Sequence, residues 1–75
     1  MKNLISGLIV KPSTREDRAL LNDFFNNSDY YAEYDSEWDC FMMPESEDTI
    51  DSLEMELTEL FTARNISARF ETNII

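Results

Sequence analysis

The chain has 75 residues, 43% hydrophobic and 12% aromatic, and its sixteen Asp and Glu outnumber its six Lys and Arg, which gives a formal net charge of -10. This length accommodates a single domain, residues 1–75, and the hydrophobic share excludes a disordered acidic tail. The charge disfavours direct binding to nucleic acid or to an anionic membrane, because both rely on cations, and it favours a basic protein surface as the partner.

Cysteine usage and the N-terminal residues indicate the compartment. The single cysteine, Cys40, has no second cysteine with which to form an intramolecular disulfide, so a reducing, cytoplasmic location is expected. The apolar stretch near the N-terminus stops at Lys11-Pro12 and has no small-residue cleavage site, which argues against a signal peptide. No apolar run approaches the roughly 20 residues of a membrane span.

The first third of the chain predicts a strand and then a helix. Residues 4–11 form an apolar run of strand length, in which Gly7 is expected to weaken the strand or mark a bulge. Ser13 and Glu16 have the spacing of a capping box, which predicts a helix that ends near Asn26-Asn27. Its apolar stripe at helical spacing comprises Leu20, Leu21, Phe24 and Phe25.

Residues 30–43 are rich in aromatic side chains and contain a polar triplet at 35–37, which predicts two strands joined by a loop. This loop implies a register that pairs Tyr34 with Trp38 and sets Glu33 directly across from Asp39. The same register pairs Ala32 with Cys40 and Tyr30 with Met42. Because the loop lacks Gly, a single long strand remains the alternative.

The last third of the chain predicts a second helix and a final strand. Residues 47–65 have an apolar face, and residues 66–74 alternate between apolar and polar side chains. The apolar face of this helix comprises Ile50, Leu53, Leu57, Leu60 and Phe61. The element order resembles the ferredoxin-like β-α-β-β-α-β plan, an α+β fold with two helices on one face of an antiparallel sheet. The alternative order is β-α-β-α-β, with one long middle strand.

The residue types argue against catalysis and against a dedicated metal or cofactor site. The chain has no His to act as a base beside a nucleophile, and the neighbours of Cys40 are expected to raise rather than lower the pKa of its thiol. Residues 35–39 place acids at alternate positions, as the front of a calcium loop does. However, Cys40 stands where that loop needs Gly, and Ser46 where it needs Glu. We therefore expect no enzyme activity and no cofactor, with a weak divalent-ion site as the remaining alternative.

The acidic residues are concentrated in the middle of the chain. Between Arg18 and Arg64 lie 45 residues with thirteen Asp and Glu and no Lys or Arg. Where surface charges serve only solubility, positive and negative side chains are normally interspersed, and opposite charges lie four residues apart on helices. Helical spacing puts Met55 opposite the apolar face of the second helix, among acids, as a candidate contact residue.

These features predict a non-enzymatic acidic module that docks on a basic, nucleic-acid-binding surface of another protein and inhibits it. In size and charge the chain is similar to small acidic proteins of phages and mobile elements, of the DNA-mimic, anti-restriction or anti-CRISPR type. The alternative is a structural or homo-oligomeric module, for example a homodimer through a strand edge, whose acidity only serves solubility. The expected partner contacts are Glu33, Asp35, Glu37, Asp39, Glu45, Glu47, Asp48, Asp51, Glu54, Met55 and Glu59.

Overall fold

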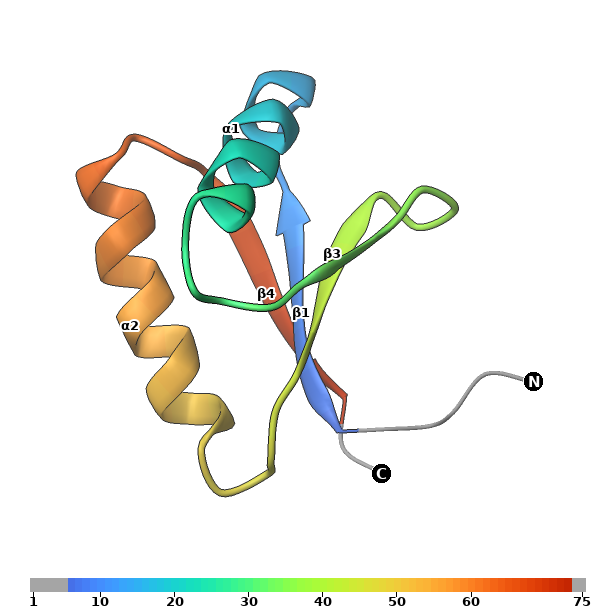
Figure 1. Ribbon diagram of the computed structural model, residues 1–75, viewed down its shortest axis with the longest axis vertical. Helices are drawn as coiled ribbons and strands as arrows, with labels where there is room; N and C mark the ends of the chain where they lie inside the picture. The colour runs from blue at the N-terminus through green and yellow to red at the C-terminus, as the bar shows by residue number, and fades with distance from the viewer. Residues whose placement is uncertain (1–5, 74–75) are drawn as a thin grey trace.

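A computed structural model of the protein describes residues 6–73, which form two helices and a four-stranded antiparallel sheet (Figure 1). The predicted first and last strands extend to Leu4 and Ile74, which lie outside the described residues. The elements in chain order are β1 (Gly7–Pro12), α1 (Arg15–Asn26), β2 (Glu33–Asp35), β3 (Cys40–Pro44), α2 (Ile50–Ala63) and β4 (Ala68–Asn73).

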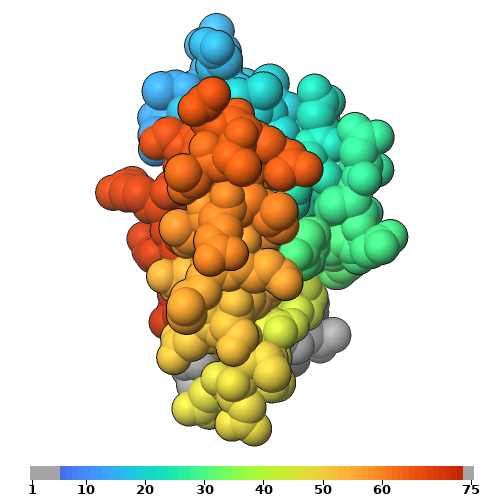
Figure 2. Space-filling view, turned by 90° about the vertical axis from the view of Figure 1, so that its left-hand side faces the viewer, coloured from blue at the N-terminus to red at the C-terminus, as the bar shows by residue number. Residues whose placement is uncertain are grey.

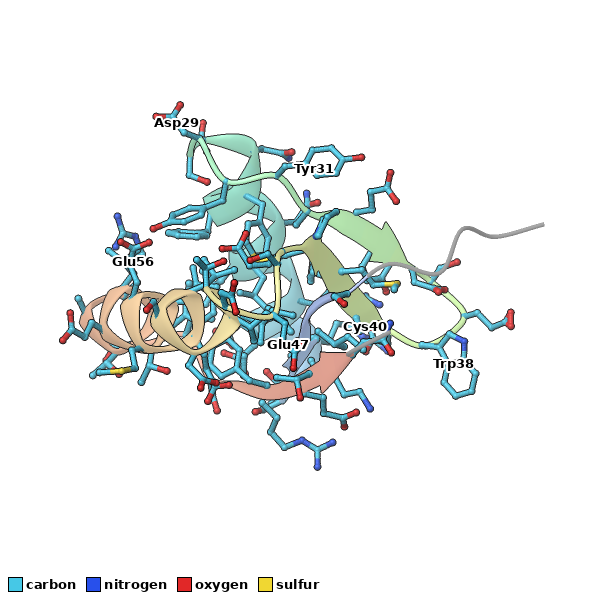
Figure 3. All side chains as sticks on the ribbon, turned by 90° about the horizontal axis from the view of Figure 1, so that it is seen from below. Asp29, Tyr31, Trp38, Cys40, Glu47 and Glu56 are labelled. Atoms are coloured by element: carbon cyan, nitrogen blue, oxygen red, sulfur yellow. The ribbon has the colours of Figure 1, made fainter. Side chains whose placement is uncertain are left out.

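The sheet has the strand order β2-β3-β1-β4, and each strand is antiparallel to its neighbours. Two separate middle strands are present, so the prediction of two strands is confirmed and the alternative of one long strand is wrong. Both helices lie on the same side of the sheet in Figures 1 and 3. Within residues 6–73, no helix combines the length and the apolar character that a membrane crossing requires.

The core lies between the sheet and the two helices. On β1, Leu8 and Val10 are fully buried, while Ile9, on the opposite face, is only half-buried. Four phenylalanines from α1, β3 and α2 meet in the core, with ring centroids 5.2–6.4 Å apart in the pairs that touch. They are Phe24, Phe25, Phe41 and Phe61.

Gly7 permits close approach of β1 to β3. An added Cβ at this position would lie 2.5 Å from the carbonyl oxygen of Met43, a distance that no side chain tolerates without a shift of the backbone. Gly7 is the first residue of β1 and is paired in register with Pro44 and with Asn73, so it marks no bulge. The glycine therefore allows β1 and β3 to lie close together at the start of β1, and the expectation of a bulge is wrong.

Helix α1 begins one residue later than the predicted capping box implies. Thr14 is the N-cap, and its hydroxyl oxygen accepts a hydrogen bond of 3.1 Å from the backbone N–H of Asp17. Ser13 instead continues the pairing of β1 with β4, because its backbone N–H donates a hydrogen bond to the carbonyl of Ser67. The predicted apolar stripe is confirmed for three of its members, whereas Leu20 is exposed.

Helix α2 and strand β4 follow their predicted patterns. The predicted apolar face of α2 lies against the core, with three residues buried and two half-buried. Arg64 follows the helix, and its guanidinium lies 5.2 Å from the centre of the Phe24 ring. On β4, Ala68 and Phe70 pack against the core, while Arg69 and Glu71 are exposed on the opposite face.

The predicted register of the β2-β3 hairpin is wrong by three residues. Tyr34 pairs with Phe41 rather than with Trp38, because the loop takes four residues, 36–39, and β3 resumes only at Cys40. The remaining pairs are Glu33 with Met42 and Asp35 with Cys40. In this register Phe41 and Met43 point into the core and are buried. The free energy gained by burying these two side chains outweighs that of the predicted contact between Tyr34 and Trp38.

Candidate protein-binding surface

Contacts among three polar side chains hold the hairpin loop in place. The Tyr34 hydroxyl donates a hydrogen bond of 2.6 Å to Asp39 Oδ1, and Arg18 Nη1 lies 3.4 Å from the Tyr34 hydroxyl oxygen and 3.6 Å from the same Asp39 oxygen. Asp39 has a φ of 50°, the left-handed conformation that Asp tolerates better than most residues. The charge of Asp39 is therefore paired with Arg18, which precedes the cation-free stretch of 45 residues, and the predicted opposition of Glu33 and Asp39 is wrong.

The other hairpin acids also take part in local hydrogen bonds. Glu33 is exposed and accepts a bond of 2.5 Å from the Tyr31 hydroxyl, which raises the pKa of that tyrosine. Asp35 is half-buried and accepts a bond of 3.0 Å from the backbone N–H of Glu37, as an aspartate in a tight turn does. These carboxylates stabilise the hairpin, and Glu33 and Glu37 remain accessible to a partner.

The segment between β3 and α2 carries three of the predicted acids. Glu45 accepts a hydrogen bond of 2.7 Å from the hydroxyl of Thr49, the N-cap of α2. Glu47 and Asp48 are exposed just before the helix, where negative charge interacts favourably with the helix dipole. A structural role at the helix start therefore accounts for part of this cluster.

The solvent-facing side of α2 carries the remaining predicted residues. Asp51, Met55 and Glu59 follow one another at intervals of four residues and form a line along the helix, which we call the α2 ridge. Met55 is 70% exposed, as predicted from helical spacing. Glu54 is half-buried and lies to one side of the ridge. Helix α2 faces the viewer in Figure 2, with β4 on one side and the green segment after α1 on the other.

Glu56 and Trp38 are exposed and were not among the predicted contacts. Glu56, beside the ridge, accepts a hydrogen bond from the Tyr30 hydroxyl, and this bond raises the pKa of Tyr30 to about 12. Trp38 is 69% exposed at the hairpin tip, because the observed register leaves it without the expected partner, Tyr34. The helical spacing of the acids was sufficient to find Glu56, whereas the exposure of Trp38 depends on the register.

The structure separates the predicted contacts into two groups. In Figure 1 the hairpin loop and α2 lie on opposite sides of the molecule, and in Figure 3 Trp38 and Glu56 lie at opposite ends. The hairpin group comprises Glu33, Asp35, Glu37 and Asp39. The helix group comprises Glu45, Glu47, Asp48, Asp51, Glu54, Met55 and Glu59. A flat partner surface can contact one group at a time.

The sheet face opposite the helices carries a shallow hollow of about 300 Å³. Cys40 lines it and is buried, and burial raises the pKa of its thiol, with a smaller contribution from Asp35. Lys11 and Glu71 form an ion pair of 2.8 Å at its rim, and this contact lowers the pKa of Glu71. The raised thiol pKa makes Cys40 a poor nucleophile.

Metal-ligand geometry and similarity to known proteins add no site to these surfaces. Among residues 6–73, no three His, Cys, Asp or Glu side chains are grouped so that they could hold a metal ion. Comparisons of the chain with known protein families, with curated proteins and with solved structures found no match. A function for the protein is therefore inferred from the chain's own residues.

Proposed function

We propose that the protein is a non-enzymatic acidic module that acts in the cytoplasm by docking its α2 ridge on a basic surface of another protein. The observation that carries the proposal is the composition of α2: four carboxylates, no Lys or Arg, and Met55 70% exposed among the acids. A helix that only needs solubility gains stability from opposite charges four residues apart, and α2 forgoes this gain. Binding to a cationic surface accounts for that cost.

The charge density of α2 supports a partner that normally binds nucleic acid. Asp51 and Glu59 are eight residues apart, or about 12 Å along the helix axis, and two further carboxylates lie between them. With Glu54 and Glu56 on either side of the ridge, the four carboxylates have a spacing along the helix axis of about 4 Å per charge, close to the roughly 3.4 Å per phosphate along one DNA strand. We propose that the protein occupies the nucleic-acid-binding groove of this partner and inhibits it, like DNA mimics of the anti-restriction or anti-CRISPR type.

Met55 supplies the ridge with an apolar centre. Binding energy in protein interfaces is concentrated in a few central side chains that lose their contact with water, while rim charges mainly affect the association rate. The flexible thioether of Met55 adapts to partners of different shape. In this proposal Met55 therefore fills a pocket between the partner's cations, and Asp51 and Glu59 pair with them.

We also assign the fold to the ferredoxin-like plan that the element order predicted. Two interlocked β-α-β units support this assignment: β3 lies between β1 and β2, and β1 lies between β3 and β4. Because this fold hosts many unrelated functions, it does not indicate which function this protein has.

The test is affinity capture with the immobilised protein, followed by titration of each captured protein with the purified chain. E59K and D23K change the net charge equally, one on the ridge and one on the exposed side of α1. We expect E59K to weaken binding at least tenfold and D23K to have little effect, and we expect duplex DNA to compete with the chain. If E59K and D23K weaken binding equally, or if salt has no effect, the α2 ridge is not the binding surface.

The hairpin group is tested with the triple variant E33K/D35K/E37K in the same titration. Because these acids lie on the other side of the molecule from α2, the α2-ridge proposal predicts that the triple variant still binds. Loss of binding in the triple variant with retention in E59K would transfer the proposed site to the hairpin. Circular dichroism of each variant verifies the fold, because Asp35 contributes a hydrogen bond to the turn.

A further inference from the structure

Strand β4 has one edge that no other strand of residues 6–73 covers, because it is the last strand in the order β2-β3-β1-β4. Hydrogen-bonded and non-hydrogen-bonded pairs alternate along its antiparallel pairing with β1. The bond from the Ser13 N–H to the Ser67 carbonyl fixes the phase of this alternation. The backbone groups of Arg69 and Glu71 therefore point toward β1, and those of Ala68, Phe70 and Thr72 point toward the free edge.

The side chains of this edge are self-complementary. If two copies of β4 align antiparallel about Phe70, the outward backbone groups of Phe70 pair with those of the second copy, and Arg69 stands opposite Glu71 of the second copy, twice. Alignment about Arg69 or about Glu71 also pairs outward backbone groups with one another, but it sets like charges opposite each other. The backbone thus limits the pairing to registers that match outward residues with one another, and among these the charges select the one centred on Phe70.

The helix side of the same edge is apolar and hollowed. The Phe70 ring stacks on Phe61 at 5.8 Å, with the two planes nearly parallel, and both line a groove of about 430 Å³ between α2 and β4. In the Phe70-centred alignment, a second copy brings its own Phe70 against this groove. The other exposed edge, β2, is only three residues long and carries Glu33 and Asp35, so two copies of it would oppose like charges.

We propose that the protein forms a homodimer in which β4 pairs antiparallel with β4 of a second copy, with Arg69 opposite Glu71 in a continuous sheet of two four-stranded halves. Each Glu71 carboxylate uses Oε2 for Lys11, which leaves its second oxygen for the arginine of the second copy. The dimer interface involves β4 and is separate from the line of residues that forms the α2 ridge.

The test is the mass in solution, measured by light scattering and native mass spectrometry on the full chain up to about 1 mM protein. We expect the wild type to dimerise, and we expect R69E and E71R, which place like charges opposite each other, to be monomeric. The decisive sample is an equimolar mixture of the two variants, because one chain then carries two acids at these positions and the other two arginines. This mixture is expected to form a heterodimer.

The double variant R69E/E71R exchanges the two charges and restores self-complementarity, so it is expected to dimerise again. It also keeps an acid near Lys11, because Arg69 is the residue paired with Lys11 in the sheet. The control D23K is expected to dimerise as the wild type does. A wild type that stays monomeric, single variants that still dimerise, or a mixture that stays monomeric would each overturn the proposal.

Discussion

The carboxylate of Asp17 accepts a hydrogen bond of 2.9 Å from the backbone N–H of Ser67, fifty residues later in the chain. Its second oxygen accepts a bond of 2.7 Å from the hydroxyl of Thr14, the N-cap of α1. Asp17 is only 7% exposed, and the two bonds, first that from Ser67, lower the pKa of its carboxyl. One side chain thus joins the start of α1 to the segment that leads into β4.

The first prediction concerns this carboxylate and acid. Because the pKa of Asp17 is lower in the folded state, its stabilising effect is present above the ordinary aspartate pKa of about 3.9 and is lost as the pH falls through the folded value. D17N is therefore expected to lower the melting temperature near pH 7, and the difference from the wild type is expected to shrink below a pH of about 4. A pH-independent difference would contradict the assignment.

The second prediction concerns Tyr30 and Glu56. The bond to the Glu56 carboxylate, together with burial, raises the pKa of Tyr30 to about 12, so the stability from this contact is present below the ordinary tyrosine pKa and is lost as the pH rises toward 12. E56Q removes the charge and is expected to lower the Tyr30 pKa. Tyrosinate absorbance during an alkaline titration measures this change, and Y30F identifies the signal. A Tyr30 pKa that is unaltered in E56Q would refute the contact.

The third prediction concerns Gly7. A methyl group there would meet the Met43 carbonyl oxygen at 2.5 Å, so β1 and β3 would have to separate at the start of β1. We expect G7A to reduce the free energy of unfolding by about 1–3 kcal/mol, the usual effect of overpacking. Chemical denaturation measures the change, and wild-type stability in G7A would show that the strands can separate freely.

The fourth prediction separates stability from binding on the α2 ridge. Met55 lies four residues from both Asp51 and Glu59, so M55K creates two opposite-charge pairs, each expected to add about 0.2–0.5 kcal/mol to the free energy of unfolding. The same substitution is expected to weaken binding to a basic partner. M55Q, which adds no charge, serves as the control. Lower stability in M55K than in M55Q would mean that the acids of α2 do not repel one another.

The helices and their buried faces were predictable from the sequence. Leu57 and Phe61 on α2 and Leu21 and Phe25 on α1 recur at helical spacing, and side chains four residues apart share a face of a helix whatever it packs against. The exposure of Met55 follows from the same geometry. Predictions succeeded where the interacting residues are within one or two helical turns of each other.

Contacts between distant segments were not predictable in this way. By sequence Ser13 is the better N-cap residue, and the pairing of Ser13 with Ser67 leaves the cap to Thr14. In the hairpin, local aromatic pairing suggested one register, and the burial of Phe41 and Met43 against the helices selected another. A strand register depends on which face finds a core, and that core is built by other segments.

The sequence by itself determined that the middle of the chain is acidic, that Met55 faces outward and that the domain has two helices and several strands. Only the tertiary structure decided that Arg18 reaches Asp39, that the hairpin acids and the acids of α2 lie on opposite sides, and that β4 presents Arg69 and Glu71 at a free edge. The physical reason is that composition and helical spacing depend on residues close together in the chain. The neighbours of a charge in space depend instead on how distant strands pair.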